Sequence, residues 1–133
     1  MADLDKFKQD IEQGYAFAGD SIILGGAMLN GEAVTDSLVK IPLKTFNRHG
    51  LIAGATGSGK TKTLQIIAEQ LSNKGVPVLL MDVKGDLSGI GAAGAGHPKI
   101  DERHAKIGIP FAAAASSVEF LSLSGEKGAR LRA

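Results

Sequence analysis

The stretch from Gly54 to Thr61 constrains this chain more than any other. It reads Gly-Ala-Thr-Gly-Ser-Gly-Lys-Thr and matches the phosphate-loop pattern Gly-x-x-x-x-Gly-Lys-[Ser/Thr] at every fixed position. A short apolar run, Leu51 to Ala53, precedes it, and residues with helical spacing follow it. A phosphate loop joins a strand to a helix, so this context favours phosphate binding over a glycine-rich turn without a ligand.

The residue types in this loop have a physical reason. Glycines let successive backbone N–H groups point into one concavity, and the start of a helix adds unpaired N–H groups. Lys60 supplies a full positive charge for the outer phosphates, and the hydroxyl of Thr61 is suited to bind Mg²⁺. The predicted nucleotide-binding residues are Gly54, Ala55, Thr56, Gly57, Ser58, Gly59, Lys60, Thr61 and Lys62.

Composition limits the class of protein. The 133 residues are 44% hydrophobic and 22% charged, which suits one folded domain or part of one. The formal net charge of +1 gives no argument for a nucleic-acid-binding surface. Cysteine is absent, which excludes disulfides and cysteine-ligated metals. The N-terminus begins acidic without an apolar stretch, so we predict no signal peptide and expect a cytoplasmic, soluble protein.

The region before the loop predicts a helix and a small β-appendage. Apolar residues at helical spacing over 4–11, followed by Gly14, indicate a short amphipathic helix that packs on its own domain. Residues 21–29 read as two short strands interrupted by a Gly-Gly pair, and 38–41 read as another. Asn30-Gly31 is a strong signal for a two-residue hairpin turn.

The region after the loop predicts a strand–helix–strand unit. Leu64, Ile67, Ala68 and Leu71 share one helical face that ends near Asn73, and residues 76–81 form a continuous apolar run. A strand over 76–81 should then lie parallel to the strand over 51–53 and be buried on both faces.

Asp82 follows that second apolar run. Ligands of open α/β sheets lie beyond the carboxyl ends of the strands, so we expect Asp82 near the phosphate loop. Three roles are open to it: holding Mg²⁺ through water, orienting the attacking water, or capping the next turn. Asp82 is therefore the predicted catalytic residue beside Lys60, with the cap as the alternative.

The remaining segments carry weaker signals. Residues 88–96 read as a Gly/Ala-rich loop, 101–107 as a short helix, 118–123 as a third strand and 128–133 as the start of another. Three interpretations are open for Arg48 and His49, which precede the loop. They contact a nucleotide, they contact a neighbouring subunit, or they form a solvated turn. The two other histidines, His97 and His104, have no metal-ligand spacing and are expected on the surface.

Elements that hydrolysis requires are missing from the sequence. No apolar run ends in Asp-Glu, and the run that ends at Asp82 is followed by Val83 instead of Glu. No arginine is identifiable as the arginine finger that neutralises charge in the transition state. The chain therefore has the character of an N-terminal piece of a longer ATPase. We expect a β-appendage with its helix over 1–46 and the start of an ATPase domain over 47–133.

The residues 47–65, Asn-Arg-His-Gly-Leu-Ile-Ala followed by the phosphate loop and Lys-Thr-Leu-Gln, resemble the bacterial HerA-like P-loop ATPases. Residues 76–89, which contain Asp-Val-Lys-Gly-Asp-Leu-Ser-Gly, are similar to the next strand and loop of the same branch. Weaker similarity in 25–32 and in 118–128 extends the resemblance over most of the chain from about residue 21 onward.

The resemblance implies an α/β fold with a RecA-like P-loop NTPase core, a parallel sheet flanked by helices. It implies ATP and Mg²⁺ as cofactors, with Lys60 on the phosphates, Thr61 on the metal and Asp82 near the γ-phosphate. Hexameric rings with ATP at subunit interfaces, and DNA translocation as in the superfamily that includes FtsK, are implied for full-length members. No membrane partner is expected.

Two other functions remain open. A nucleotide-binding assembly module would bind ATP without useful turnover and act through a partner. A GTPase or kinase-type loop is weaker, because Asp82-Val83-Lys84-Gly85 offers Asp-x-x-Gly but no guanine-reading Asn-Lys-x-Asp follows it.

Overall fold

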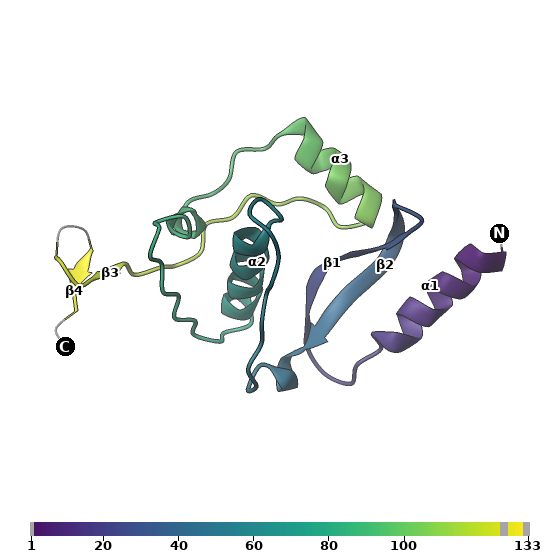
Figure 1. Cartoon of the computed structure of the whole chain (residues 1–133), viewed down its shortest axis with the longest axis horizontal. Helices are drawn as coiled ribbons and strands as arrows, with labels where there is room; N and C mark the ends of the chain where they lie inside the picture. The colour runs from purple at the N-terminus through teal and green to yellow at the C-terminus, as the bar shows by residue number, and fades with distance from the viewer. Residues whose placement is uncertain (1, 126–127, 132–133) are drawn as a thin grey trace.

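The computed structural model describes residues 2–125 and 128–131. A β-hairpin of β1 (Ser21–Leu29) and β2 (Glu32–Pro42) lies at its centre. Helix α1 (Ala2–Gly14) packs on β2, while α2 (Lys60–Asn73) and α3 (Pro98–Ile107) lie on the other side of the hairpin (Figure 1). The short elements are η1 (Leu43–Thr45), η2 (Ser88–Gly91), β3 (Leu121–Ser122) and β4 (Ala129–Arg130).

The hairpin confirms the predicted turn, and its two strands are longer than predicted. Asn30 and Gly31 both have positive φ, 51° and 86°, as a two-residue hairpin turn with the right twist requires. The strand β1 runs through Gly25-Gly26 without a break, because register shifts on either side of this pair absorb the irregularity. Its partner β2 is longer than the predicted 38–41 because pairing extends to Glu32, directly after the turn.

The buried apolar residues are few: Ile22 and Ala27 of β1, Val34 of β2, Ala68 and Leu71 of α2, and Leu87. Ile22 of β1 is fully buried, and Ala68 and Leu71 are the buried members of the predicted helical face of α2. The side-chain amide of Gln70 joins α2 to β1: its Oε1 accepts from the N–H of Ile23 at 2.7 Å, and its Nε2 donates to the carbonyl of Ile23 at 2.6 Å. Gln70 thus occupies the edge of β1 in the way that a neighbouring strand would.

The other two helices also confirm their predictions. In α1, Phe7 and Ile11 are half-buried, and the helix packs on its own hairpin as expected. The ring of His97 accepts from the N–H of Lys99 and so caps α3, which has Pro98 at its first position. Gly108 ends α3 with a φ of 78°. No helix in the described part of the chain is long and apolar enough to cross a membrane.

The predicted parallel sheet through residues 51–53 and 76–81 is wrong for the described residues. Both runs are irregular, with Leu51 90%, Leu79 81% and Met81 88% exposed. An apolar run becomes a strand only when a neighbour pairs with its backbone N–H and C=O groups. The edge of β1 near Ile23 is taken by Gln70, and no strand of the described chain pairs with either run.

The late strands are shorter than predicted. Only Leu121–Ser122 of the run 118–123 pairs, in parallel, with Ala129–Arg130 of the run 128–133. Residues 132–133 of that second run lie outside the described part of the chain. The predicted loop over 88–96 holds the single short turn η2. The described fold is therefore a small α/β arrangement around a hairpin, in which the predicted RecA-like sheet is not formed.

The contact between the hairpin and α3 predicts unequal effects for two adjacent glycines. A Cβ on Gly26 would lie 2.6 Å from Cγ2 of Ile107, whereas a Cβ on Gly25 would meet nothing within 4 Å. We expect Gly26→Ala to lower the free energy of unfolding by about 1–3 kcal/mol through overpacking. The matched Gly25→Ala variant should change it by less than about 0.5 kcal/mol. Urea unfolding measures both, and equal losses would contradict the packing described here.

Candidate nucleotide-binding site

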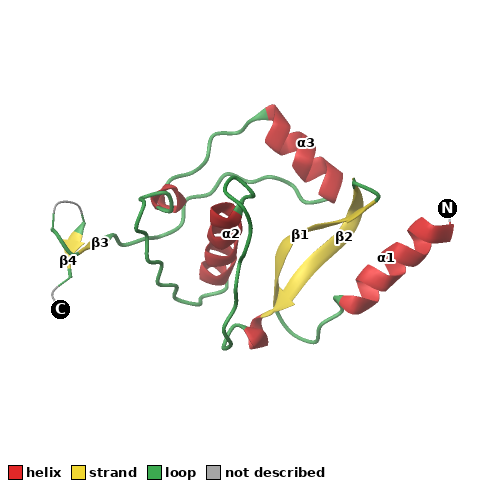
Figure 2. Cartoon of the chain, in the orientation of Figure 1, coloured by secondary structure: helices red, strands yellow, loops and turns green. Residues whose placement is uncertain are grey.

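The predicted phosphate loop lies at the N-terminal end of α2. Figure 2 shows it as the last part of a long irregular segment that runs from η1 along the helix and then enters it. Residues 54–59 are exposed, and Lys60 and Thr61 are partly buried at the first turn of α2. The loop is therefore an open surface from which the start of the helix is accessible.

The backbone of this loop suits an anion. Gly57 and Gly59 have φ of 81° and 94°, a conformation that side chains other than glycine rarely adopt. Gly59 precedes the helix, and no side chain caps the first turn. The N–H groups at the start of a helix lack intrahelical acceptors and carry partial positive charge, which favours phosphate oxygens there.

The carbonyl of Ala55 organises the side chains of the loop. The hydroxyl of Ser58 donates to it at 2.7 Å, and Nζ of Lys60 donates to it at 2.8 Å. A Cβ on Gly54 would lie 2.5 Å from Oγ of Ser58, so the backbone at Gly54 and the side chain of Ser58 approach each other closely. The ammonium of Lys60 has three donors, so it can hold this carbonyl and still offer N–H to phosphate oxygens.

Asp86 is the acidic residue that reaches the first turn of α2. The hydroxyl of Thr61 donates to Oδ2 of Asp86 at 3.1 Å. The amide Nε2 of Gln65, one turn further along α2, donates to the backbone carbonyl of Asp86 at 3.2 Å. Nζ of Lys62 in turn donates to Oε1 of Gln65 at 2.9 Å. The segment after residue 81 thus reaches the first turns of α2 through Asp86, whereas the residue predicted to lie near the phosphate loop was Asp82.

Asp82 itself acts as a clamp on the turn that carries Asp86. Its carboxylate accepts from the N–H groups of Lys84 at 3.2 Å, Gly85 at 2.8 Å and Leu87 at 2.9 Å. These bonds, that of Leu87 first, hold the pKa of the Asp82 carboxyl below its ordinary value. The structure thus displays the capping role among the three that the sequence left open. The catalytic role of Asp82 stays a prediction.

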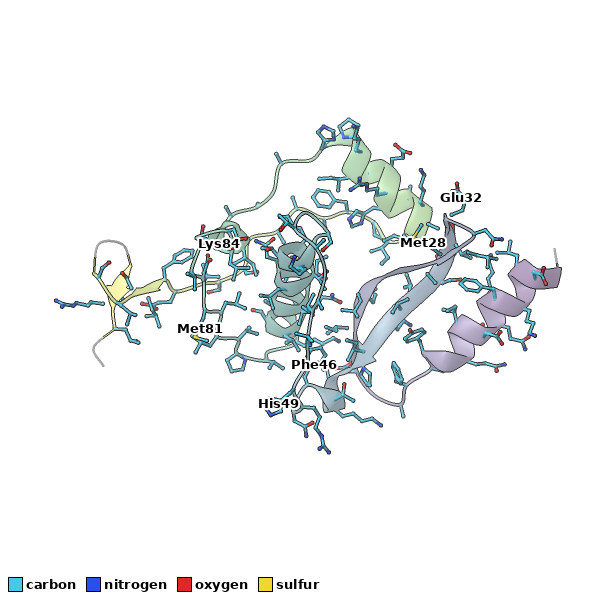
Figure 3. All side chains as sticks on the ribbon, in the orientation of Figure 1. Met28, Glu32, Phe46, His49, Met81 and Lys84 are labelled. Carbon is cyan, nitrogen blue, oxygen red and sulfur yellow. The ribbon has the colours of Figure 1, made fainter. Side chains whose placement is uncertain are left out.

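Arg48 and His49 do not join the loop. Figure 3 places His49 beyond the end of α2 that is opposite the phosphate loop, and both residues are exposed. Lys84, in the turn clamped by Asp82, lies beside the other half of the helix (Figure 3). The solvated-turn interpretation of Arg48 and His49 therefore fits their position. His97 is exposed, whereas Nδ1 of the half-buried His104 lies 3.0 Å from the carbonyl of Ile109.

A cavity of about 630 Å³ lies between β1, α2 and α3. Its lining is largely apolar and includes Lys62, Gln65 and Glu69 of α2, but none of residues 54–61. No group of three or more His, Cys, Asp or Glu side chains in the described residues is arranged to hold a metal ion.

Over residues 28–133, the sequence matches the family described as helicase HerA-like C-terminal. The chain belongs to this family. A segment of 48 residues is also 40% identical to the DNA double-strand break repair helicase HerA of Saccharolobus solfataricus. That segment covers 36% of the chain and 10% of the length of the archaeal helicase. No solved structure matches the chain. Family membership confirms the resemblance that the residues around the phosphate loop indicate.

Sequence reasoning missed Asp86 in this HerA-like chain. The sequence feature that could have indicated Asp86 is the glycine before it. In the structure Gly85 has a φ of 77°, and the backbone reverses there between the two aspartates. The sequence singles out Asp82 because it directly follows an apolar run, and this rule assumes that the run forms a strand. Because the run over 76–81 is irregular, the later aspartate is the one that contacts the helix.

The clamp formed by Asp82 makes a pH-dependent prediction. A lowered pKa means that the carboxylate stabilises the folded turn above its unfolded pKa, and that this contribution is lost as pH falls through the folded pKa. NMR titration of the Gly85 and Leu87 amides should show a midpoint below that of an unfolded aspartate. Asp82→Asn should remove this transition and leave that of Glu102, which pairs with Lys106, unchanged. A midpoint at or above the unfolded value would contradict the clamp.

Proposed function

We propose that this HerA-like chain binds ATP with Mg²⁺ through residues 54–62. The observation that carries the proposal is the first turn of α2, where uncapped N–H groups, the Lys60 ammonium and the Thr61 hydroxyl adjoin one glycine-rich loop. Membership in a family described as helicase HerA-like supports a nucleotide as the anion. We keep the division into a β-appendage over 1–46 and an ATPase region over 47–133 as part of this proposal.

The residues at the loop suit Mg²⁺ as the companion of the nucleotide. Mg²⁺ prefers oxygen ligands, keeps several waters and is held by few protein groups together with phosphates. Thr61 provides a hydroxyl oxygen beside the carboxylate of Asp86, and we assign Thr61 as the protein ligand. When bound, Mg²⁺ supplies positive charge that neutralises the phosphate oxygens. Lys60 adds a second positive charge from the protein side.

The activity of a whole protein that contains this chain is a wider proposal. We propose that ATP hydrolysis there is coupled to DNA translocation or processing, in a hexameric ring with ATP between subunits. The name of the archaeal relative, a DNA double-strand break repair helicase, supports DNA as the substrate, although the matched segment covers 10% of that protein. The formal net charge of +1 makes tight DNA binding by this chain alone unexpected.

A binding module without useful turnover is the second candidate, and one observation favours it. The carboxylate of Asp82, the predicted catalytic residue, already accepts three backbone N–H groups. Its lowered pKa makes it a weak base, and a general base works best with a pKa near the operating pH. Steady-state phosphate release separates the two candidates, since the binding module would give none above background.

The main proposal predicts a ligand-induced stabilisation. ATP with Mg²⁺ at 100 times its dissociation constant should add about 2.7 kcal/mol to the free energy of unfolding and raise Tm by several degrees. Lys60→Ala should remove most of this shift, because the phosphates lose their nearest cation. Lys44→Ala, which removes an exposed lysine on η1, should keep the full shift. An unchanged Tm at millimolar ATP, or an equal shift in the Lys60→Ala variant, would contradict the proposal.

A further inference from the structure

We infer that Asp86 is the positioning residue for the metal side of the nucleotide site: it turns the Thr61 hydroxyl so that its lone pairs are available to Mg²⁺, and it supplies a negative charge beside that ion. The inference rests on the proposed function and deepens it. Its basis is the hydrogen bond of 3.1 Å from Thr61 Oγ1 to Asp86 Oδ2.

The direction of that hydrogen bond fixes the hydroxyl. A threonine hydroxyl has one proton and two lone pairs, and a deprotonated carboxylate can only accept. The proton of Thr61 is therefore directed at Asp86, and the lone pairs are directed away from it. Thr63, two residues later, shows the usual alternative for a helical threonine, because its hydroxyl donates to the carbonyl of Gly59 at 3.3 Å. Asp86 keeps Thr61 ready to act as a metal ligand.

The backbone around Asp86 is held on both sides. The N–H groups of Gly85 and Leu87, which flank it, donate to the Asp82 carboxylate at 2.8 and 2.9 Å. The carbonyl of Asp86 accepts from Gln65 of α2, and the side chain of Leu87 is buried. A carboxylate that is fixed before the ligand arrives loses little conformational freedom on binding. Asp82 therefore contributes to the site by holding the turn, and Asp86 contributes the charge.

The charge of Asp86 gives the inference a signature that depends on the metal. A carboxylate beside the phosphates of ATP repels them when no cation lies between, and attracts the cation when one does. Removing this charge should weaken binding of ATP with Mg²⁺ and leave binding of ATP without metal unchanged or tighter. A residue with a merely structural role would weaken both.

Calorimetric titration of the purified chain with ATP, in excess Mg²⁺ and in EDTA, tests this signature. Asp86→Asn should raise the Kd of ATP with Mg²⁺ about tenfold or more, as loss of an outer-shell partner of a metal ligand does. Its Kd in EDTA should stay the same or fall. Asp10→Asn, at an exposed aspartate of α1, should change neither value. Equal weakening with and without Mg²⁺, or no change in either, would overturn the inference.

A double-mutant cycle tests whether Asp86 acts through Thr61. In a Thr61→Val background, Asp86→Asn should raise the Kd of ATP with Mg²⁺ by a smaller factor than in the unsubstituted chain, because the part of its effect that acts through the Thr61 hydroxyl is already lost. Effects that multiply independently would overturn the assignment to Thr61. If the unsubstituted chain binds no ATP, the proposed function fails as well; if it binds ATP and Asp86→Asn behaves like Asp10→Asn, only the inference fails.

A measurement on the unsubstituted chain removes any dependence on how the variants fold. Mn²⁺ in place of Mg²⁺ broadens the NMR signals of nearby carbons. In the complex with ATP, the side-chain carboxyl signal of Asp86 should broaden at a lower Mn²⁺ concentration than that of Asp82. The reverse order, or equal broadening, would overturn the inference.

Discussion

The two hydrogen bonds between the amide of Gln70 and the backbone of Ile23 hold the phosphate-loop helix against the hairpin. Each bond pairs a part-buried backbone group of β1. Without its partner, such a group would destabilise the fold by about 1–3 kcal/mol. Ala68 and Leu71 add apolar contact from the same helix. Because α2 is fixed near this end, its other end presents the loop of residues 54–59 to solvent.

The N-terminal half of α2 is held by the turn that follows residue 81. The side chains of Thr61 and Gln65 both donate hydrogen bonds to Asp86. The carboxylate of Asp82 accepts from backbone N–H groups of the same turn, including that of Leu87. The two aspartates of Asp-Val-Lys-Gly-Asp therefore have different tasks in the described chain. One pairs with the backbone, and the other faces the residue that we assign to Mg²⁺. This division of labour links the fold of the turn to the chemistry proposed for the loop.

The elements that the sequence predicted correctly are those whose signals are local. The helix α1, the Asn30-Gly31 turn, α2 and α3 each depend on spacing, caps or turn residues within a few positions. The runs over 51–53 and 76–81 failed because a strand needs a partner, and apolar residues alone do not supply one. For the same reason the sequence singles out Asp82 alone: that prediction depends on a strand end that is not formed in the described residues, and Asp86 is the aspartate that bonds to Thr61.

The site was predictable to the same extent. The loop residues 54–61 follow from a motif whose parts are contiguous, whereas Asp86 meets Thr61 across 25 positions. His49 closely precedes the loop in sequence but lies beyond the opposite end of α2, because the segment between them runs along the helix (Figures 2 and 3). Motif residues are thus found by pattern, while the residues that position them require the fold.

If residues 54–62 hold the phosphates of ATP at the start of α2, as we propose, their backbone amides lie nearest to the bound ligand. Amide NMR of the chain, titrated with ATP and Mg²⁺, detects which amides respond. The largest shifts should fall on the amides of Gly57, Gly59, Lys60, Thr61 and Lys62, with smaller ones on Asp86. Shifts that are absent at millimolar ATP, or that concentrate around His49 at the other end of the helix, would contradict the account.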